Sequence, residues 1–92
     1  MRFVSFYCCT SVCSPSRASL MTGIHSGHLS FRGNNGKYPD KWDRVPLRKT
    51  EITIPEMLKS TDYQSAMIGK WHVDVPEDTS TWAKGRGFDY AN

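Results

Sequence analysis

The chain has 92 residues, of which 38% are hydrophobic and 23% are charged, and twelve basic against nine acidic side chains leave a net charge of +3. A chain of this length is long enough for one small domain, and its composition excludes both a plainly disordered protein and one built around a membrane span. The basic residues are scattered and form no cationic run, so we expect no nucleic-acid partner.

The N-terminal stretch, residues 2–7, alternates and is rich in aromatic and β-branched side chains, which predicts a strand leading toward Cys13. This stretch superficially resembles a signal peptide. However, its apolar run is broken by Ser5 and Thr10, and no pair of small residues in the pattern of a cleavage site precedes Cys13. We therefore reject the signal-peptide interpretation.

The three cysteines, Cys8, Cys9 and Cys13, are an odd and crowded set, which does not make a disulfide framework. Adjacent cysteines pair only with strain, so Cys8 and Cys9 are expected to stay reduced. A small zinc module that combines these thiols with His25 and His28 is an alternative from another functional class. Zinc sites prefer cysteine pairs separated by two to four residues, and adjacent cysteines fit that spacing badly.

A helix is predicted over 15–22, with Ser14 as its N-cap, proline at its first position and Gly23 at its end. Cys13 then lies just ahead of the helix N-terminus, where free N–H groups and the helix dipole favour negative charge. Arg17 follows Cys13 by about one helical turn, so both side chains can point to one place. Together these features indicate chemistry on an oxyanion.

The pattern Cys-x-Pro-Ser-Arg-x-x-Leu-x-Thr-Gly over 13–23 resembles the signature of the sulfatase family. The resemblance implies that a formylglycine-generating enzyme oxidises Cys13 to formylglycine, an aldehyde whose hydrate is the nucleophile. It also implies that Arg17 holds the hydrated aldehyde in place. The alternative is a buried cysteine before an ordinary helix, which leaves the Pro-Ser-Arg spacing unexplained.

Glycine and proline recur among polar residues over 25–48, which predicts a long loop. Such length is typical of a functional surface or of an excised piece of a larger domain. Thr53 and Glu56 have the spacing of a capping box, and Pro55 suits a first helical turn, so a short amphipathic helix to about Ser60 is expected. The last stretch, from Val75 to Asn92, is predicted to be mostly irregular.

An apolar run within 63–69 predicts a buried strand that ends in Gly-Lys-Trp-His at 69–72. In an extended backbone Lys70 and His72 project to one side, while Trp71 turns into the packing. A Lys-x-His pair by itself is more often a coincidence of surface residues.

Residues 63–72 resemble the second sequence block of the sulfatases, in which an aromatic residue, a buried strand and Gly-Lys-Trp-His follow one another. The resemblance implies that Lys70 contacts the sulfate and the formylglycine, and that His72 hydrogen-bonds the hydrate. Milder similarities extend the resemblance to about residues 2–90. Four polar residues in these parts are interpreted as structural or substrate-rim residues: His25, His28, Arg32 and Asp89.

The resemblance further implies calcium, a hard cation that takes about six to eight oxygen ligands. The family supplies them through an early pair of aspartates, the formylglycine and a much later Asp-Asn or Asp-Gln pair. This chain is expected to begin after the first pair and to end before the second, so Cys13 is its only assigned metal ligand. Residues 1–92 are accordingly interpreted as an internal fragment of a sulfatase N-terminal catalytic domain, of the α/β, alkaline-phosphatase-like fold.

The predicted function is hydrolysis of sulfate esters of a small molecule or glycan, with Cys13, Arg17, Lys70 and His72 as catalytic residues and Lys70 also binding substrate. Two alternatives are a formylglycine-dependent phosphodiesterase or phosphonate monoester hydrolase, and an inactive truncated fragment whose cut sheet exposes edges and apolar surface. The isolated 92-residue chain is expected to be inactive. By resemblance, the expected location is the periplasm, the extracellular space or the lysosome.

Overall fold

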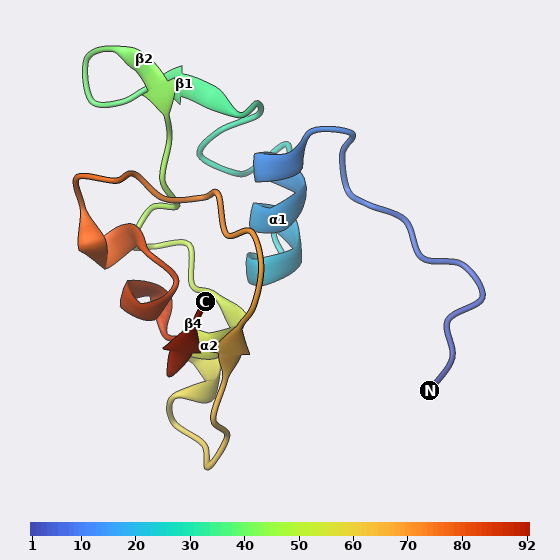
Figure 1. Cartoon of the computed structure of the whole chain (residues 1–92). Helices are drawn as coiled ribbons and strands as arrows, with labels where there is room; N and C mark the ends of the chain where they lie inside the picture. The colour runs from blue at the N-terminus through green and yellow to red at the C-terminus, as the bar shows by residue number, and fades with distance from the viewer.

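The computed structural model describes all 92 residues and contains both helices and short strands. In Figure 1, α1 lies beside a hairpin of β1 and β2, while α2 lies close to β3 and β4 at the opposite end. None of the helices is long and apolar enough to cross a lipid bilayer. In chain order, the elements are α1 (Cys13–Thr22), β1 (Asn35–Lys37), β2 (Trp42–Arg44), α2 (Ile54–Leu58), β3 (Ala66–Met67), the 3₁₀ helices η1 (Thr79–Thr81) and η2 (Lys84–Arg86), and β4 (Tyr90–Ala91).

The helix α1 ends as predicted but begins earlier. Gly23 adopts the left-handed conformation, with φ of 70°, and its N–H donates to Ser19 O at 2.8 Å. A side chain is strained at such a φ and glycine is not, which explains the stop. At the other end Cys13 is already helical, and Val12 occupies the N-cap without a capping side chain. The prediction of Ser14 as N-cap is therefore wrong: Ser14 lies inside the helix and is buried.

The strand predicted over 2–7 is absent. The segment runs alone along one side of the molecule (Figure 1), and the side chains of Phe3 and Phe6 are 67% and 71% exposed. A strand exists through hydrogen bonds to a neighbouring strand, and no other segment of the chain pairs with this one. The β-type sequence pattern is thus present without the partner that it needs.

The long loop predicted over 25–48 contains a two-stranded antiparallel hairpin, so that prediction was wrong in part. In the hairpin, Asn35 pairs with Arg44 and Lys37 pairs with Trp42. Asparagine, glycine and lysine are poor strand formers, which is why the residue types of β1 did not indicate a strand.

The helix α2 has the predicted capping box. Thr53 Oγ1 accepts from Glu56 N at 3.5 Å, and Thr53 N–H donates to Glu56 Oε2 at 2.8 Å. The helix ends at Leu58 instead of Ser60. Local capping chemistry therefore located the start of this element.

The strand predicted within 63–69 is reduced to β3, which pairs in parallel with β4. The prediction that this run is buried is wrong, because Ile68 is 78% exposed and Ala66 is exposed as well. β4 lies in the stretch predicted as mostly irregular. The two strands have two residues each, and only Met67 and Ala91 are half-buried, so the apolar character of the run does not lead to full burial here.

The hydrophobic core is small and joins four parts of the chain. Only 16 of 92 residues are buried, and large apolar side chains such as Tyr63 and Met57 stay exposed. Leu47 N–H donates to Val73 O at 3.1 Å, which ties the centre of the core together. The core cluster consists of Ala18, Leu29, Phe31, Leu47 and Val73.

Candidate active site

The structure brings together all four residues predicted to be catalytic, although two come from α1 and two from the segment after β3. Cys13 Sγ lies 3.5 Å from His72 Nδ1 and 3.9 Å from Lys70 Nζ. The Arg17 guanidinium donates to the backbone carbonyl of Lys70. The first turn of α1 and the 70–72 segment therefore form one cluster around the Cys13 side chain.

His72 reaches this cluster through a turn and not through an extended strand. Its φ is 55°, in the left-handed region that few residues other than glycine adopt, so the predicted strand geometry over 70–72 is wrong. Lys70 and His72 nevertheless face the same thiol. Trp71 points the other way, packs against the core and donates from Nε1 to Thr81 O at 3.0 Å. The left-handed residue redirects the chain so that the imidazole meets Cys13.

Asn34 is a site residue that the sequence did not reveal. Its Oδ1 accepts from Ser14 N at 3.1 Å and from Cys13 Sγ at 3.0 Å. Because Val12 has no capping side chain, Asn34 acts as the cap of α1 from a loop about twenty residues away. Asn34 lies within residues 2–90, over which the sequence resembles the sulfatases, but only the fold shows its contact with Cys13.

Ser14 connects the helix to the histidine. Its Oγ donates to His72 O at 2.9 Å and lies 3.2 Å from His72 Nδ1. These contacts hold the histidine in its left-handed conformation. Ser14, which was predicted to cap α1, thus positions His72 on the other side of the site.

The charges around Cys13 favour its ionised form. Partial burial is the largest single influence and raises the pKa of the thiol, but the Lys70 charge and hydrogen bonds from Ser14 together lower it by more, so the pKa of Cys13 is lowered overall. Burial, followed by the charges of Lys70 and Arg44, lowers the pKa of His72 below 6.5. The imidazole is therefore neutral at neutral pH and can accept a proton.

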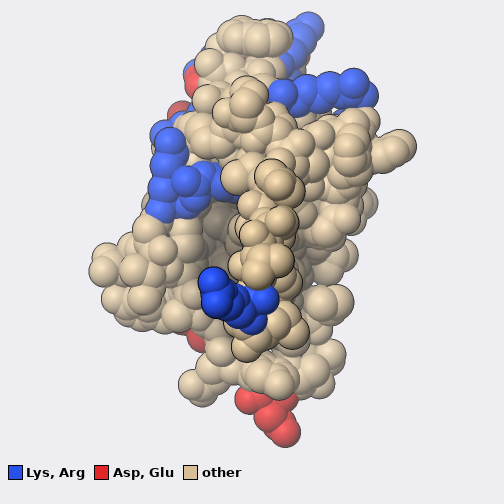
Figure 2. Space-filling view, turned by 90° about the vertical axis from the view of Figure 1, so that its right-hand side faces the viewer, with Lys and Arg blue, Asp and Glu red and all other residues tan.

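A cavity of about 260 Å³ opens beside Cys13 and Arg17. Figure 2 shows the face that carries the N-terminal segment, where Lys and Arg side chains gather around a shallow hollow and acidic side chains lie only at the edges. Arg17 Nε is buried and has no hydrogen-bond partner within the chain. The site is thus open, positively charged and suited to an anion.

The side chains of the chain do not form a metal site by themselves. No group of three or more His, Cys, Asp or Glu is placed to hold a metal ion. Asp74, the acidic residue nearest in sequence to His72, pairs with Arg44 at 3.7 Å. The alternative of a zinc module is therefore wrong for this structure. Cys13 remains the one residue that is assigned as a calcium ligand.

Of the four residues interpreted as structural or substrate-rim residues, three contact residues nearby in the sequence, whereas Asp89 bonds to distant segments. His25 Nδ1 accepts from Gly27 N at 3.1 Å, and the ring of His28 packs edge-on against that of His25. Arg32 donates to Gly27 O at 2.8 Å. Asp89 accepts from Ser65 N at 2.8 Å and pairs with Lys59 at 2.9 Å.

A comparison with known families gives a match between residues 1–91 and the family model described as Sulfatase. The chain belongs to the sulfatase family. This is a family of hydrolases, and the predicted resemblance is confirmed.

Individual relatives agree with this assignment. The chain is 41% identical to Arylsulfatase G of Mus musculus over 98% of its own length, and 36% identical to Arylsulfatase A of Homo sapiens over 96%. A solved structure, the crystal structure of Ps i-CgsB, superposes with a TM-score of 0.72 at 30% identity over 91% of the chain.

The chain spans only a small part of these proteins: 16% of the mouse relative, 17% of the human relative and 18% of the solved chain. It is a partial sulfatase domain with mixed helix and strand elements. The small core and the many exposed apolar side chains accord with this partial coverage.

Proposed function

We propose that residues 1–92 are the part of a sulfatase N-terminal catalytic domain, of the alkaline-phosphatase-like α/β fold, that carries the nucleophile for hydrolysis of sulfate esters. The signature block is 13–23 and the second block is 63–72. The observation that carries the proposal is the convergence of Lys70 and His72 on Cys13, at the N-terminus of α1, in a chain of the sulfatase family. Both a helix N-terminus and a lysine favour a bound oxyanion.

Cys13 is the proposed site of formylglycine, and its Sγ stands in for the oxygens of that group. Once formed, formylglycine supplies a hydrated aldehyde, which is a reversible oxygen nucleophile for sulfate transfer and release. The residues present fit such a group, because Asn34 Oδ1 and His72 Nδ1 can accept from hydroxyls at this position, and Lys70 can donate. Cys13 is also only partly buried, so a modifying enzyme can reach it.

Each neighbouring side chain has a proposed task. Lys70 binds the sulfate group and offsets charge on its oxygens. Arg17 fixes the backbone at Lys70 and adds its own positive charge to the site. His72, neutral at neutral pH because its pKa is lowered, takes a proton at Nδ1.

Calcium remains the proposed cofactor of the whole protein, but this chain offers it only the side chain at Cys13. Calcium wants about six to eight oxygen ligands, so the other ligands are proposed to come from further parts of a longer protein. For the same reason we propose that the isolated 92 residues are inactive. Because the chain belongs to the sulfatase family, we propose that the longer protein works in the periplasm, outside the cell or in the lysosome.

Mass spectrometry of the chain coexpressed with a formylglycine-generating enzyme tests the central claim. We expect an aldehyde at position 13, trapped as a hydrazone, while Cys8 and Cys9 remain thiols and serve as internal controls. Detection of only unmodified cysteine at position 13 contradicts the proposal. The cations of the site alone do not distinguish a sulfate from a phosphate ester. Comparing hydrolysis of an aryl sulfate with hydrolysis of a phosphodiester by the longer protein therefore separates a sulfatase from a formylglycine-dependent phosphodiesterase or phosphonate monoester hydrolase.

A further inference from the structure

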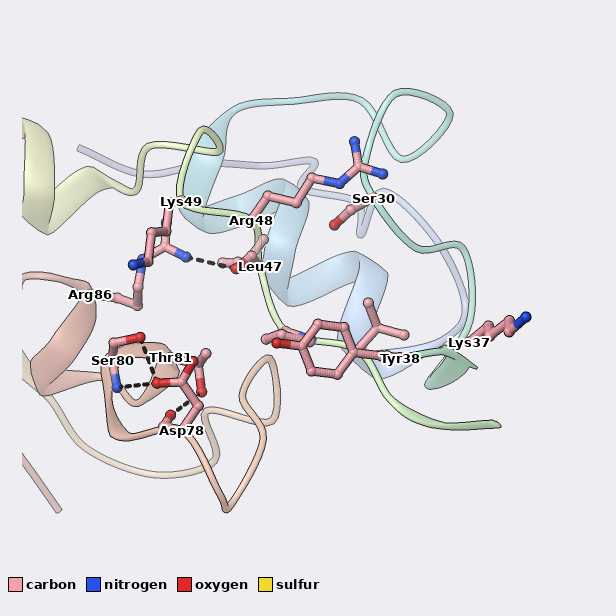
Figure 3. A pocket seen from close by; sticks show the side chains of 12 residues that line it. Ser30, Lys37, Tyr38, Leu47, Arg48, Lys49, Asp78, Ser80, Thr81 and Arg86 are labelled. Carbon is pink, nitrogen blue, oxygen red and sulfur yellow. Dashed lines mark hydrogen bonds between the residues drawn. The ribbon is translucent and has the colours of Figure 1, made fainter. Parts of the chain in front are cut away.

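Cys8 is a second thiol that borders the cavity beside Cys13, and the proposed function does not use it. Besides these two cysteines, residues 10–12 and the α1 side chains of Ser16 and Arg17 line this cavity. Figure 3 shows a different cavity, lined by side chains such as Tyr38, and no cysteine lines that one. Two thiols therefore share one hollow, and it is the hollow at the proposed nucleophile.

The chain bends between the two thiols before α1 begins (Figure 1). Within this bend, Val12 N–H donates to Thr10 Oγ1 at 3.3 Å. No backbone hydrogen bond fixes residues 1–11 to the rest of the fold. A disulfide requires Cα atoms about 5.5–6 Å apart. The segment that carries Cys8 can adopt this spacing without opening the helix, because its movement breaks no backbone hydrogen bond.

Cys9 is placed differently, although it is one residue closer to Cys13 in the sequence. Its side chain borders a separate hollow on α1, beside Ser19 and Leu20, and Cys13 does not line that hollow. Hydrogen bonds with Ser19 and then with Ser26 lower the pKa of Cys9 and hold its thiol on that side. Cys8 borders both hollows, so it alone of the two faces Cys13.

We propose that Cys8 and Cys13 form a reversible disulfide, with oxidised glutathione as the oxidant. Cys8 is exposed and Cys13 is half-buried, so glutathione reaches Cys8 first. The Cys8 thiolate attacks one glutathione sulfur, releases one glutathione and leaves a mixed disulfide. The Cys13 thiolate then attacks Cys8 Sγ and expels the second glutathione. Two protein thiols thus lose two electrons and two protons, and one glutathione disulfide becomes two glutathione thiols.

The disulfide leaves the start of α1 intact. It replaces only the contacts of Cys13 Sγ, while Ser14 N–H still donates to Asn34 Oδ1. The inference rests on the proposed function for its meaning, because a Cys13 held in a disulfide is not available for conversion to formylglycine. The bond also protects an unmodified Cys13 from irreversible oxidation. Reducing thiols reopen it, since an exposed disulfide is a labile one.

The disulfide is measured in glutathione redox buffers, by alkylation of the free thiols and mass spectrometry of the digested chain. C8S and C9S are a matched pair, because each leaves Cys13 with one partner at nearly the same sequence separation. We expect C9S to form the Cys13 disulfide as the parent does, with an equilibrium constant against glutathione about tenfold or more above that of C8S. Both replaced side chains are exposed, so the variants keep the fold.

The same measurement in concentrated urea is the control for the fold. There the constants of C8S and C9S should become nearly equal, because only the fold directs Cys8 and not Cys9 toward Cys13. Equal constants in the folded chain, a difference that persists in urea, or thiols that stay free in every buffer each overturn the inference. The assay needs no formylglycine. Failure to find an aldehyde after coexpression therefore contradicts the proposed function alone, and failure to find the Cys8–Cys13 disulfide contradicts this inference alone.

Discussion

Replacing Arg86 by methionine removes the guanidinium that joins α2 to the segment before it. Nε and Nη2 of Arg86 each donate to the Glu56 carboxylate at 3.0 Å. Nη1 donates to Leu47 O at 3.1 Å, and Nη2 also donates to Glu51 O at 2.6 Å. Methionine keeps much of the apolar volume, so the substitution tests the loss of charge and hydrogen bonds more than the creation of a cavity.

The expected loss follows from the burial of both partners. The Arg86 side chain is 4% exposed and that of Glu56 is 26% exposed. Removing one partner of a buried ion pair costs about 3–5 kcal/mol, and each buried carbonyl left without a donor costs about 1–3 kcal/mol. Water reaches Glu56 in part, so we expect the free energy of unfolding to fall by about 3 kcal/mol. That is a large share of the roughly 5–14 kcal/mol available to a domain of this size.

The free energy of unfolding is measured by urea titration with tryptophan fluorescence, since the Trp71 ring packs against Phe88 with centroids 5.8 Å apart. The control is K59M, which removes the exposed ion pair with Asp89 and should cost less than about 1 kcal/mol. If R86M costs no more than K59M, the buried network does not hold these segments together and our reasoning is wrong.

Two further predictions concern the cap and the pH dependence. N34A should weaken α1 by about 0.5–2 kcal/mol, seen as faster amide exchange at the start of that helix, and unchanged exchange there contradicts the role of Asn34 as cap. The lowered pKa of Glu56 stabilises the fold above pH 4.5, and this contribution is lost as the pH falls through the folded value. The lowered pKa of His72 means that stability falls as the pH drops below 6.5. E56Q should reduce the pH dependence of the free energy of unfolding below pH 4.5, and H72Q should reduce it below pH 6.5. A variant profile that runs parallel to that of the parent chain contradicts the role of the replaced group.

The elements that were predicted correctly depend on nearby residues. The left-handed Gly23 and the Thr53–Glu56 capping box act within one helical turn, so their chemistry is readable from the sequence. The prediction of a strand over 2–7 was wrong because a strand depends on distant residues. Its pattern is correct for a strand, but strands need a partner elsewhere in the fold.

In the active-site cluster, too, some features are set by nearby residues and others depend on distant segments. The spacing of Cys13 and Arg17 on one helix, and the neighbouring positions of Lys70 and His72, are properties of the sequence, as is membership in the sulfatase family. Only the tertiary structure shows that a left-handed His72 turns toward the thiol and that Asn34 caps α1 across the fold. Helix spacing and capping are set by a few consecutive residues, whereas a contact between distant segments depends on how the whole chain packs.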